Sequence, residues 1–120
     1  MGPHVLIVED DALVADVIVA ALEADYATSL AETSAAALQI LADRKVDLML
    51  LDCTLPDGID PDLIPAADAA GVPVVLMSGD PKRAESLTKQ PRPFLLKPFT
   101  LTELVAALRR EIGDAAPSAV

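Results

Sequence analysis

Short runs of consecutive apolar residues alternate along the chain with segments in which apolar residues recur at helical spacing. Runs of this length without polar alternation are typical of strands buried on both faces of a parallel sheet. They predict strands at residues 4–8, 48–51, 72–77 and 94–96, and a weaker strand at 26–30 completes a set of five.

Amphipathic helices are predicted between the strands, because apolar and charged side chains separate onto opposite sides of residues 12–24 and 33–42. The residues expected on the buried side of the first helix are Leu13, Val17, Ala21 and Leu22. The last helix begins with a capping box formed by Thr100 and Glu103 and ends at Gly113. The residues expected on its buried side are Leu101, Leu104, Val105 and Leu108.

Prolines disturb the third and fourth helices. Pro61 is typical of a helix start, whereas Pro65 would then lie one turn inside the helix and remove a backbone hydrogen bond. The third helix is therefore either kinked or begins only at Pro65. The fourth helix starts near Pro81 and has about two turns before Pro91 ends it.

Five strands that alternate with five helices predict an α/β fold with an open, doubly wound parallel sheet. In such sheets ligands bind outside the carboxyl ends of the strands, at the point where the strand order reverses. The residues that follow each predicted strand are therefore the first candidates for chemistry.

Length and composition predict one domain over residues 1–120, with a core at 4–112 and a flexible tail at 113–120. Hydrophobic residues make up 52% of the chain and aromatic residues only 2%, so the core must be aliphatic. The net charge of −10 disfavours contact with nucleic-acid phosphates and favours a cation or a basic partner. The lone cysteine, Cys53, and the lack of a signal peptide or spanning segment lead us to expect a cytoplasmic protein without a membrane partner.

Acidic residues follow two of the predicted strands. Glu9, Asp10 and Asp11 come at the end of the first strand, and Asp52 comes at the end of the third. Carboxylates that converge at one sheet edge repel one another unless a cation lies between them, and an oxygen-only cluster suits Mg²⁺. The sequence therefore predicts a magnesium site at this edge.

Two other strands end in a hydroxyl and an ammonium group, Ser78 and Lys97. A metal and a lysine can share the charge of phosphoryl oxygens while a hydroxyl donates a further hydrogen bond. This combination predicts phosphoryl chemistry, in which Asp52 is the nucleophile that forms an acyl phosphate.

Four motifs carry a resemblance to a known family: VLIVEDD at 5–11, LDCTLPDG at 51–58, MSG at 77–79 and FLLKPF at 94–99. Together, and in this order, they resemble the response-regulator receiver domains of bacterial two-component systems, over essentially residues 4–112. The resemblance implies a flavodoxin-like sheet with strand order 2-1-3-4-5. It also implies a phosphorylation switch that takes its phosphoryl group from a histidine kinase or a histidine phosphotransfer protein and then contacts a downstream protein target.

The resemblance also implies a role for each residue of the site. Asp52 resembles the phosphorylated residue, and Asp10 and Asp52 would bind Mg²⁺ directly, with Glu9 acting through water and Thr54 lending its backbone carbonyl. Ser78 and Lys97 would hold the phosphoryl oxygens. Phe94 resembles the aromatic switch residue, and the bond between Lys97 and Pro98 would be cis.

Two spacings depart from the family pattern. Asp52 and Ser78 are 26 positions apart, and Ser78 and Lys97 are 19 apart, both a few residues shorter than the family leads us to expect. The third and fourth helices are therefore predicted to be short. Thr54 and Asp80 occupy positions that vary within the family and are thought to tune dephosphorylation.

Simpler interpretations exist for each residue. The acids could be a solvated loop with a helix cap, Ser78 could start a turn, and Phe94 could be only a partly buried strand aromatic. Cys53 is expected to be a passive side chain, although it could be oxidised, and His4 is given no role. Two other functions stay open: a phosphorylation-independent binding module on the same fold, and a small aspartyl-nucleophile phosphohydrolase. We do not expect an independent enzyme, because a hydrolase of that type has a second aspartate at the position of Thr54 and a cap that this chain lacks.

Overall fold

Five short strands pair in parallel to form one sheet in the computed structural model, which describes residues 2–86 and 91–112. The strands are β1 (His4–Val8), β2 (Ala27–Ala31), β3 (Leu48–Asp52), β4 (Val74–Ser78) and β5 (Phe94–Leu96). Their order, β2-β1-β3-β4-β5, confirms the predicted strand order. The helix end predicted at Gly113 and the tail predicted at 113–120 lie outside the described residues.

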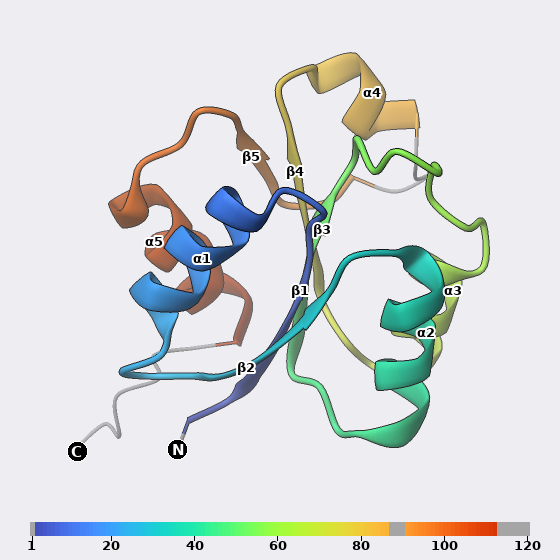
Figure 1. The fold of residues 1–120 in the computed structure, drawn as a ribbon, viewed down its shortest axis with the longest axis horizontal. Coiled ribbons are helices and arrows are strands. Elements are labelled where there is room, and N and C mark those ends of the chain that lie inside the picture. Colours follow the sequence, from blue (N-terminus) through green and yellow to red (C-terminus); the bar gives the residue numbers. More distant parts are fainter. Residues whose placement is uncertain (1, 87–90, 113–120) are drawn as a thin grey trace.

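Helices cover both faces of the sheet (Figure 1). They are α1 (Ala12–Leu22), α2 (Ser34–Asp43), α3 (Leu63–Ala69), α4 (Pro81–Ser86) and α5 (Leu101–Ile112). Helices α1 and α5 pack with one buried cluster of the sheet, whereas α2, α3 and α4 contribute to the cluster on the opposite face. The fold is therefore the doubly wound architecture that the alternation of elements predicts.

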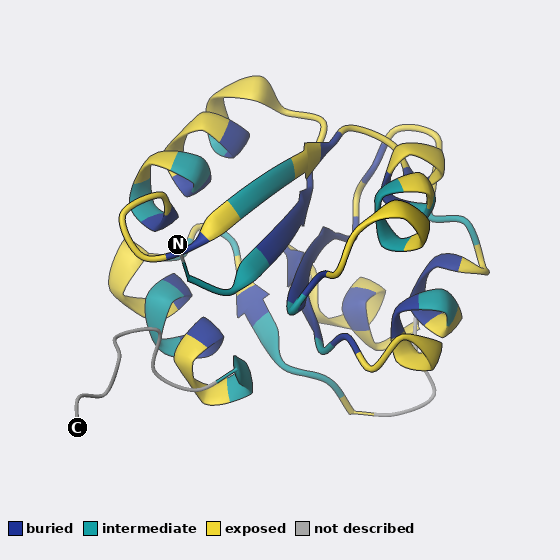
Figure 2. Ribbon diagram, turned by 90° about the horizontal axis from the view of Figure 1, so that it is seen from below, coloured by how far each residue is buried: buried dark blue, intermediate teal, exposed yellow. Residues whose placement is uncertain are grey.

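The core lies along the three central strands (Figure 2). Every residue of β3 and β4 is buried, and so are four of the five residues of β1. Burial of both faces explains why these strands read as continuous apolar runs. The edge strand β2 has only one buried residue, which explains its weaker signal in the sequence.

Side-chain caps fix where three helices begin. The carboxylate of Asp11 accepts hydrogen bonds from the backbone N–H groups of Leu13 and Val14 at the start of α1. Thr33 caps α2 in the same way. Before α5, the hydroxyl of Thr100 accepts from the N–H of Glu103 at 3.0 Å, and the N–H of Thr100 donates to the carboxylate of Glu103 at 2.9 Å. These two bonds confirm the predicted capping box.

The predicted buried sides of α1 and α5 are wrong in part. The buried residues of α1 are Ala15, Ile18 and Leu22, whereas Leu13 is 78% exposed and Val17 is 55% exposed. In α5, Leu101 is 49% exposed and Ala107 is buried instead. Apolar residues occur all round α1, so its periodicity does not determine which side faces the sheet.

The third helix begins at neither predicted position. It starts at Leu63, which puts Pro65 in the first turn, where a backbone N–H has no partner within the helix. Pro65 therefore costs no hydrogen bond and causes no kink. With seven residues, α3 is shorter than α1, α2 and α5, as the short spacing from Asp52 to Ser78 predicts. The described part of α4 has six residues, and residues 87–90, which follow it, lie outside the description. No helix in the described ranges is long and apolar enough to cross a membrane.

Candidate functional site

Polar residues from four strands meet at one edge of the sheet. Glu9 follows β1, Asp52 ends β3, Ser78 ends β4 and Lys97 follows β5. The register places the ends of these strands side by side, with Val8 opposite Leu51, Asp52 opposite Met77 and Ser78 opposite Leu96. The point where the strand order reverses, between β1 and β3, lies at the centre of this edge.

Three carboxylates form an acidic cluster at this edge. Glu9 and Asp52 are each only 1% exposed, whereas Asp10 is open to solvent. One oxygen atom from each of the three lies within 4.8 Å of the others. Two buried carboxylates and an exposed one at this spacing could hold a metal ion between them.

Lys97, which follows the edge strand β5, reaches the two buried carboxylates with its side chain. Its Nζ lies 3.2 Å from Oε1 of Glu9, to which it donates a hydrogen bond, and 3.4 Å from Oδ2 of Asp52. The peptide bond between Lys97 and Pro98 is cis. The ammonium group compensates part of the negative charge, and it leaves the cluster with a net negative charge when all three acids are ionised.

The two buried carboxylates titrate differently. Burial, together with the neighbouring Asp52, raises the pKa of Glu9 to about 7. Burial would also raise the pKa of Asp52, but hydrogen bonds from Glu9 and from Thr54 hold this pKa below its usual value. The pKa of Lys97 lies above its usual value despite burial, because Asp52 and Glu9 favour its charged form. Near neutral pH, Asp52 therefore carries the charge and Glu9 can keep a proton.

These residues fit a hard divalent cation. All the candidate ligand atoms are oxygens, and the proton that Glu9 retains is the one that a cation would displace. A softer metal ion, which prefers thiolate or imidazole ligands, would find neither in this cluster. The chemistry of the donor set therefore favours magnesium or a similar ion.

Hydrogen bonds hold the nucleophile candidate in place. The backbone N–H of Thr54 donates to Oδ1 of Asp52 at 2.9 Å, and the Thr54 hydroxyl donates to the same atom at 2.8 Å. This contact of the Thr54 side chain was not predicted, because the position of a hydroxyl relative to a carboxylate is not visible in the sequence. The outer oxygen, Oδ2, faces Lys97.

The fully buried Ser78 has its hydroxyl engaged with the start of α4. It accepts a hydrogen bond from the N–H of Asp80 at 2.9 Å and donates to the carbonyl of the same residue at 3.1 Å. Phe94, on β5, is half-buried and packs against the cluster under α2, α3 and α4. The two residues therefore lie on the side of the site that faces α4.

Two candidates from the sequence lie outside the reactive cluster. Cys53 is buried, and burial together with the charge of Asp52 raises the pKa of its thiol to about 11, so the thiol stays protonated. The ring of His4 lies at the opposite end of β1, where it contacts the carbonyl of Lys45 and the hydroxyl of Ser29.

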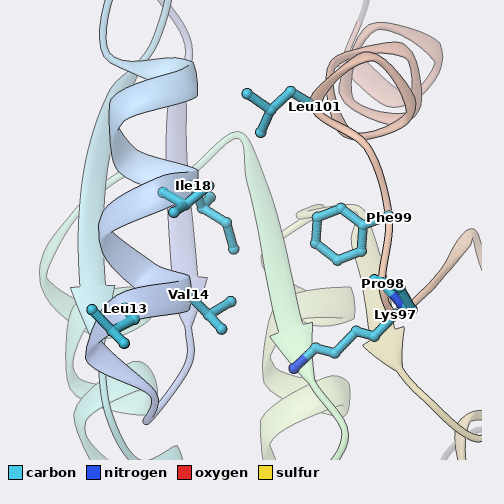
Figure 3. Close-up of a pocket in the computed structure, with 8 residues that line it drawn as sticks. Leu13, Val14, Ile18, Lys97, Pro98, Phe99 and Leu101 are labelled. Carbon is cyan, nitrogen blue, oxygen red and sulfur yellow. The ribbon is translucent and has the colours of Figure 1, made fainter.

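An apolar groove adjoins the site between α1 and α5 (Figure 3). Its volume is about 480 Å³, and Figure 3 shows Leu13 and Val14 on one wall and Phe99 and Leu101 on the other. The side chain of Lys97 extends along one end of the groove toward the carboxyl end of β3. Sequence reasoning missed this groove because it assigned three of its residues to the core: Leu13, Val17 and Leu101.

The comparisons with known proteins agree with this geometry. A family model described as the response regulator receiver domain matches residues 5–109. The chain is 31% identical over 125 residues to the phosphate regulon transcriptional regulatory protein PhoB of Pseudomonas aeruginosa, covering 98% of this chain and 55% of PhoB. It is 36% identical over 123 residues to the KDP operon transcriptional regulatory protein KdpE of Escherichia coli, covering 95% of this chain and 55% of KdpE.

These proteins are longer than this chain, which spans about half the length of the curated relatives it matches. Among solved structures, the receiver domain of the sensor histidine kinase PA1611 from Pseudomonas aeruginosa is similar with a TM-score of 0.82 and 27% identity. That match covers 95% of this chain and 100% of the other, whose crystal structure has a magnesium ion coordinated in the active-site cleft.

Proposed function

The chain belongs to the response regulator receiver domain family, and on that premise we propose that it accepts a phosphoryl group on Asp52 from a phosphohistidine donor. It is a signalling domain of the two-component type. In this proposal phosphorylation changes the surface of the domain, and the signal passes on by contact with another protein. We do not propose that the chain turns over an independent substrate. We propose that the reaction takes place in the cytoplasm.

Asp52 supplies the nucleophile. Its low pKa keeps the carboxylate ionised, and the two hydrogen bonds from Thr54 hold Oδ1, so that Oδ2 is the oxygen that attacks. The new bond forms between Oδ2 and phosphorus as the nitrogen–phosphorus bond of the donor breaks. The donor imidazole keeps that electron pair and leaves as a neutral ring, because its other ring nitrogen carries a proton in the reacting form.

Lys97 stabilises the negative charge of the group in transfer, because its ammonium already lies 3.4 Å from Oδ2. Glu9, Asp10, Asp52 and the carbonyl of Thr54 are the groups that would hold Mg²⁺. When bound, the ion supplies further positive charge beside the phosphoryl oxygens.

Ser78 connects the site to α4. We expect its hydroxyl to exchange the backbone of Asp80 for a phosphoryl oxygen, since both arrangements satisfy this buried group. The exchange frees the turn that precedes α4 and gives Phe94, which packs on the same side, room to move. A change of charge at Asp52 would thereby alter the surface formed by α4 and β5.

The observation that carries the proposal is the convergence of Asp52, Lys97 and two further acids at one sheet edge. Aspartyl-nucleophile phosphohydrolases usually have a second aspartate two positions after the nucleophile, and here that position is Thr54, whose hydroxyl donates a hydrogen bond to Asp52.

Sensor kinases that carry radiolabelled phosphohistidine test the identity of the donor. Label should move from at least one kinase of a panel to the unmodified chain and not to an Asp52→Asn variant. Retention of the label on every kinase would contradict the phosphohistidine donor.

A further inference from the structure

Two neighbouring exposed acids, Asp10 and Asp11, connect β1 to α1, and the fold uses them differently (Figure 1). Asp10 contributes an oxygen to the acidic cluster, and its carboxylate forms no hydrogen bond within the described part of the chain. By contrast, Oδ1 of Asp11 accepts hydrogen bonds from the backbone N–H groups of Leu13 at 2.9 Å and Val14 at 3.3 Å. The carboxylate of Asp11 therefore begins the helix and is not one of the candidate metal ligands.

The backbone of Asp11 contacts the site directly. Its N–H group donates a hydrogen bond to Oε2 of Glu9 at 3.2 Å. The other oxygen of Glu9, Oε1, accepts from Nζ of Lys97, also at 3.2 Å. Each oxygen of this buried carboxylate thus has its own donor, and the two bonds together fix the orientation of the group.

Asp11 also fixes the backbone that carries Asp10. The carbonyl of Asp11 accepts the first hydrogen bond of α1, from the N–H of Ala15 at 2.9 Å. On the other side of Asp10, the N–H of Glu9 donates to the carbonyl of Ala31, the last residue of β2, at 2.9 Å. The backbone of Asp10 therefore lies between one residue that is hydrogen-bonded to the sheet and one that is hydrogen-bonded to the helix.

We propose that Asp11 is a positioning residue of the metal site: its side chain holds the start of α1, and its backbone then holds Glu9 and Asp10 in the arrangement that binds the ion. The proposal rests on the proposed function and adds to it a residue that is not itself a ligand. Groups that orient metal ligands typically cost about tenfold or more in affinity when they are lost.

The position of the Asp11 side chain is what matters in this proposal, and its negative charge is not. Asn and Ser begin helices about as well as Asp, because their side-chain oxygens accept the same backbone hydrogen bonds. A purely electrostatic role would instead depend on the charge, since a further anion near the cluster attracts a cation whether or not it caps the helix. Substitutions at Asp11 can therefore separate the two roles.

Two variants of the full chain make this separation. Asp11→Ala removes both the cap and the charge, and the dissociation constant for Mg²⁺ should rise about tenfold. Asp11→Asn removes only the charge and keeps an oxygen that can accept from Leu13 and Val14, so the constant should stay within about threefold of that of the unmodified chain. Isothermal titration calorimetry with Mg²⁺ alone measures both constants, without a phosphoryl donor.

Thr33→Ala is the matched control for the loss of a helix cap. The hydroxyl of Thr33 accepts a hydrogen bond from the N–H of Ala36 at 3.1 Å at the start of α2, and Thr33 is not among the candidate metal ligands. Urea denaturation without Mg²⁺ should show similar losses of stability for Thr33→Ala and Asp11→Ala. The Mg²⁺ dissociation constant of Thr33→Ala should nevertheless stay within about twofold of that of the unmodified chain. Circular dichroism checks that all variants are folded.

The rate of phosphorylation by acetyl phosphate gives a second readout. In Asp11→Ala the Mg²⁺ concentration that gives half the maximal rate should rise about tenfold, while the rate at saturating Mg²⁺ should stay within about threefold. The reason is that all the ligands are still present, so a high concentration of the ion can restore their arrangement. A role in helix stability alone would leave both values unchanged.

The outcomes distinguish this role from the proposed function. Equal Mg²⁺ affinity for Asp11→Ala and the unmodified chain would overturn the role of Asp11 and leave the proposed function in place. Binding by Asp11→Asn as weak as by Asp11→Ala, or equal weakening in Thr33→Ala, would overturn the role as well. If the unmodified chain binds no Mg²⁺, the proposed metal site and the role of Asp11 fail together. If it binds Mg²⁺ but is never phosphorylated, the proposed function fails, and calorimetry still decides the role of Asp11.

Discussion

The two sides of the phosphorylation site offer different surfaces to a partner. On the α1 and α5 side the surface is an apolar groove whose lining includes Leu13, Val17 and Leu101. On the other side, a second groove between the loop after β3 and helix α4 carries charged residues: Asp80, Lys82 and Arg83. In α4 itself the only buried residue is Ala84, and no large apolar residue of its described length is exposed.

This difference indicates that the two sides of the site have different roles. An apolar groove can hold a partner helix through burial of surface, whereas exposed charges hold partners weakly and in a manner sensitive to salt. The hydroxyl of Ser78 is hydrogen-bonded to the backbone of Asp80, directly before α4, so a change at the site can shift the start of this helix. We therefore expect stable contacts on the α1 and α5 side and conformational change on the α4 side.

The largest expected effect comes from Lys97, which lies between the two sides. A Lys97→Met variant keeps the aliphatic stem in the groove and loses the ammonium beside Asp52, so phosphorylation by acetyl phosphate should slow about a hundredfold. Lys82→Met removes a charge of the same kind from α4 and should leave the rate within about threefold, since Lys82 makes no contact with Asp52 among the described ion pairs. Equal rates for the two variants would mean that the site does not depend on Lys97.

The two sides of α1 should differ in stability. Ile18 is buried, so Ile18→Ala should lower the free energy of unfolding by about 2–5 kcal/mol through the cavity that it leaves. Leu13→Ala should change it by less than about 0.5 kcal/mol, because this side chain is exposed. Urea denaturation measures both. A large loss from Leu13→Ala would show that the groove is part of the core and unsuited to docking.

Metal binding should depend on pH through Glu9. Its pKa of about 7 lies above the usual value, so a cation must displace a proton, and affinity should rise as the pH rises through this value. Between about pH 6 and about pH 8, the affinity for Mg²⁺ should increase roughly tenfold. Isothermal titration calorimetry in buffers of different ionisation enthalpy measures the released proton. Glu9→Gln should remove the dependence, and a pH-independent affinity in the unmodified chain would contradict the proton on Glu9.

The smallest expected effect is a change in the free energy of unfolding from a substitution far from the groove. The guanidinium of Arg92 donates two hydrogen bonds to the carboxylate of Asp68 on α3, and it lowers the pKa of that exposed acid. Asp68→Asn should cost less than about 1 kcal/mol at neutral pH. Because the folded pKa is lowered, the contribution is present above the unfolded value and is lost as the pH falls through the folded value. Thermal melts at neutral and acidic pH check this, and a cost that is independent of pH would point to packing instead.

The sequence predicts the sheet well because burial on both faces leaves continuous apolar runs in β1, β3 and β4. The spacing from Asp52 to Ser78 even predicts that α3 is short. The orientation of α1 could not be predicted, because the helix carries its own apolar side chains on nearly all sides, and several of these sides could have faced the sheet. Because Leu13 and Val17 were predicted to be buried, the groove was not predicted.

The acids and the lysine of the site could be named from the ends of the strands, since parallel strands bring those ends together. The hydrogen bonds of the site could not be predicted from the sequence. The contact of the Thr54 hydroxyl with Asp52, and of the Ser78 hydroxyl with the backbone of Asp80, depends on side-chain rotamers that local sequence does not determine. The same is true of the proton that burial keeps on Glu9.

The most direct test of the central claim is intact mass spectrometry after incubation with acetyl phosphate. The unmodified chain should gain the mass of one phosphoryl group when Mg²⁺ is present and lose that gain when the ion is removed by a chelator. An Asp52→Asn variant should gain nothing under either condition. A phosphoryl group on the Asp52→Asn variant, or none on the unmodified chain, would contradict the assignment of Asp52 as the residue that accepts it.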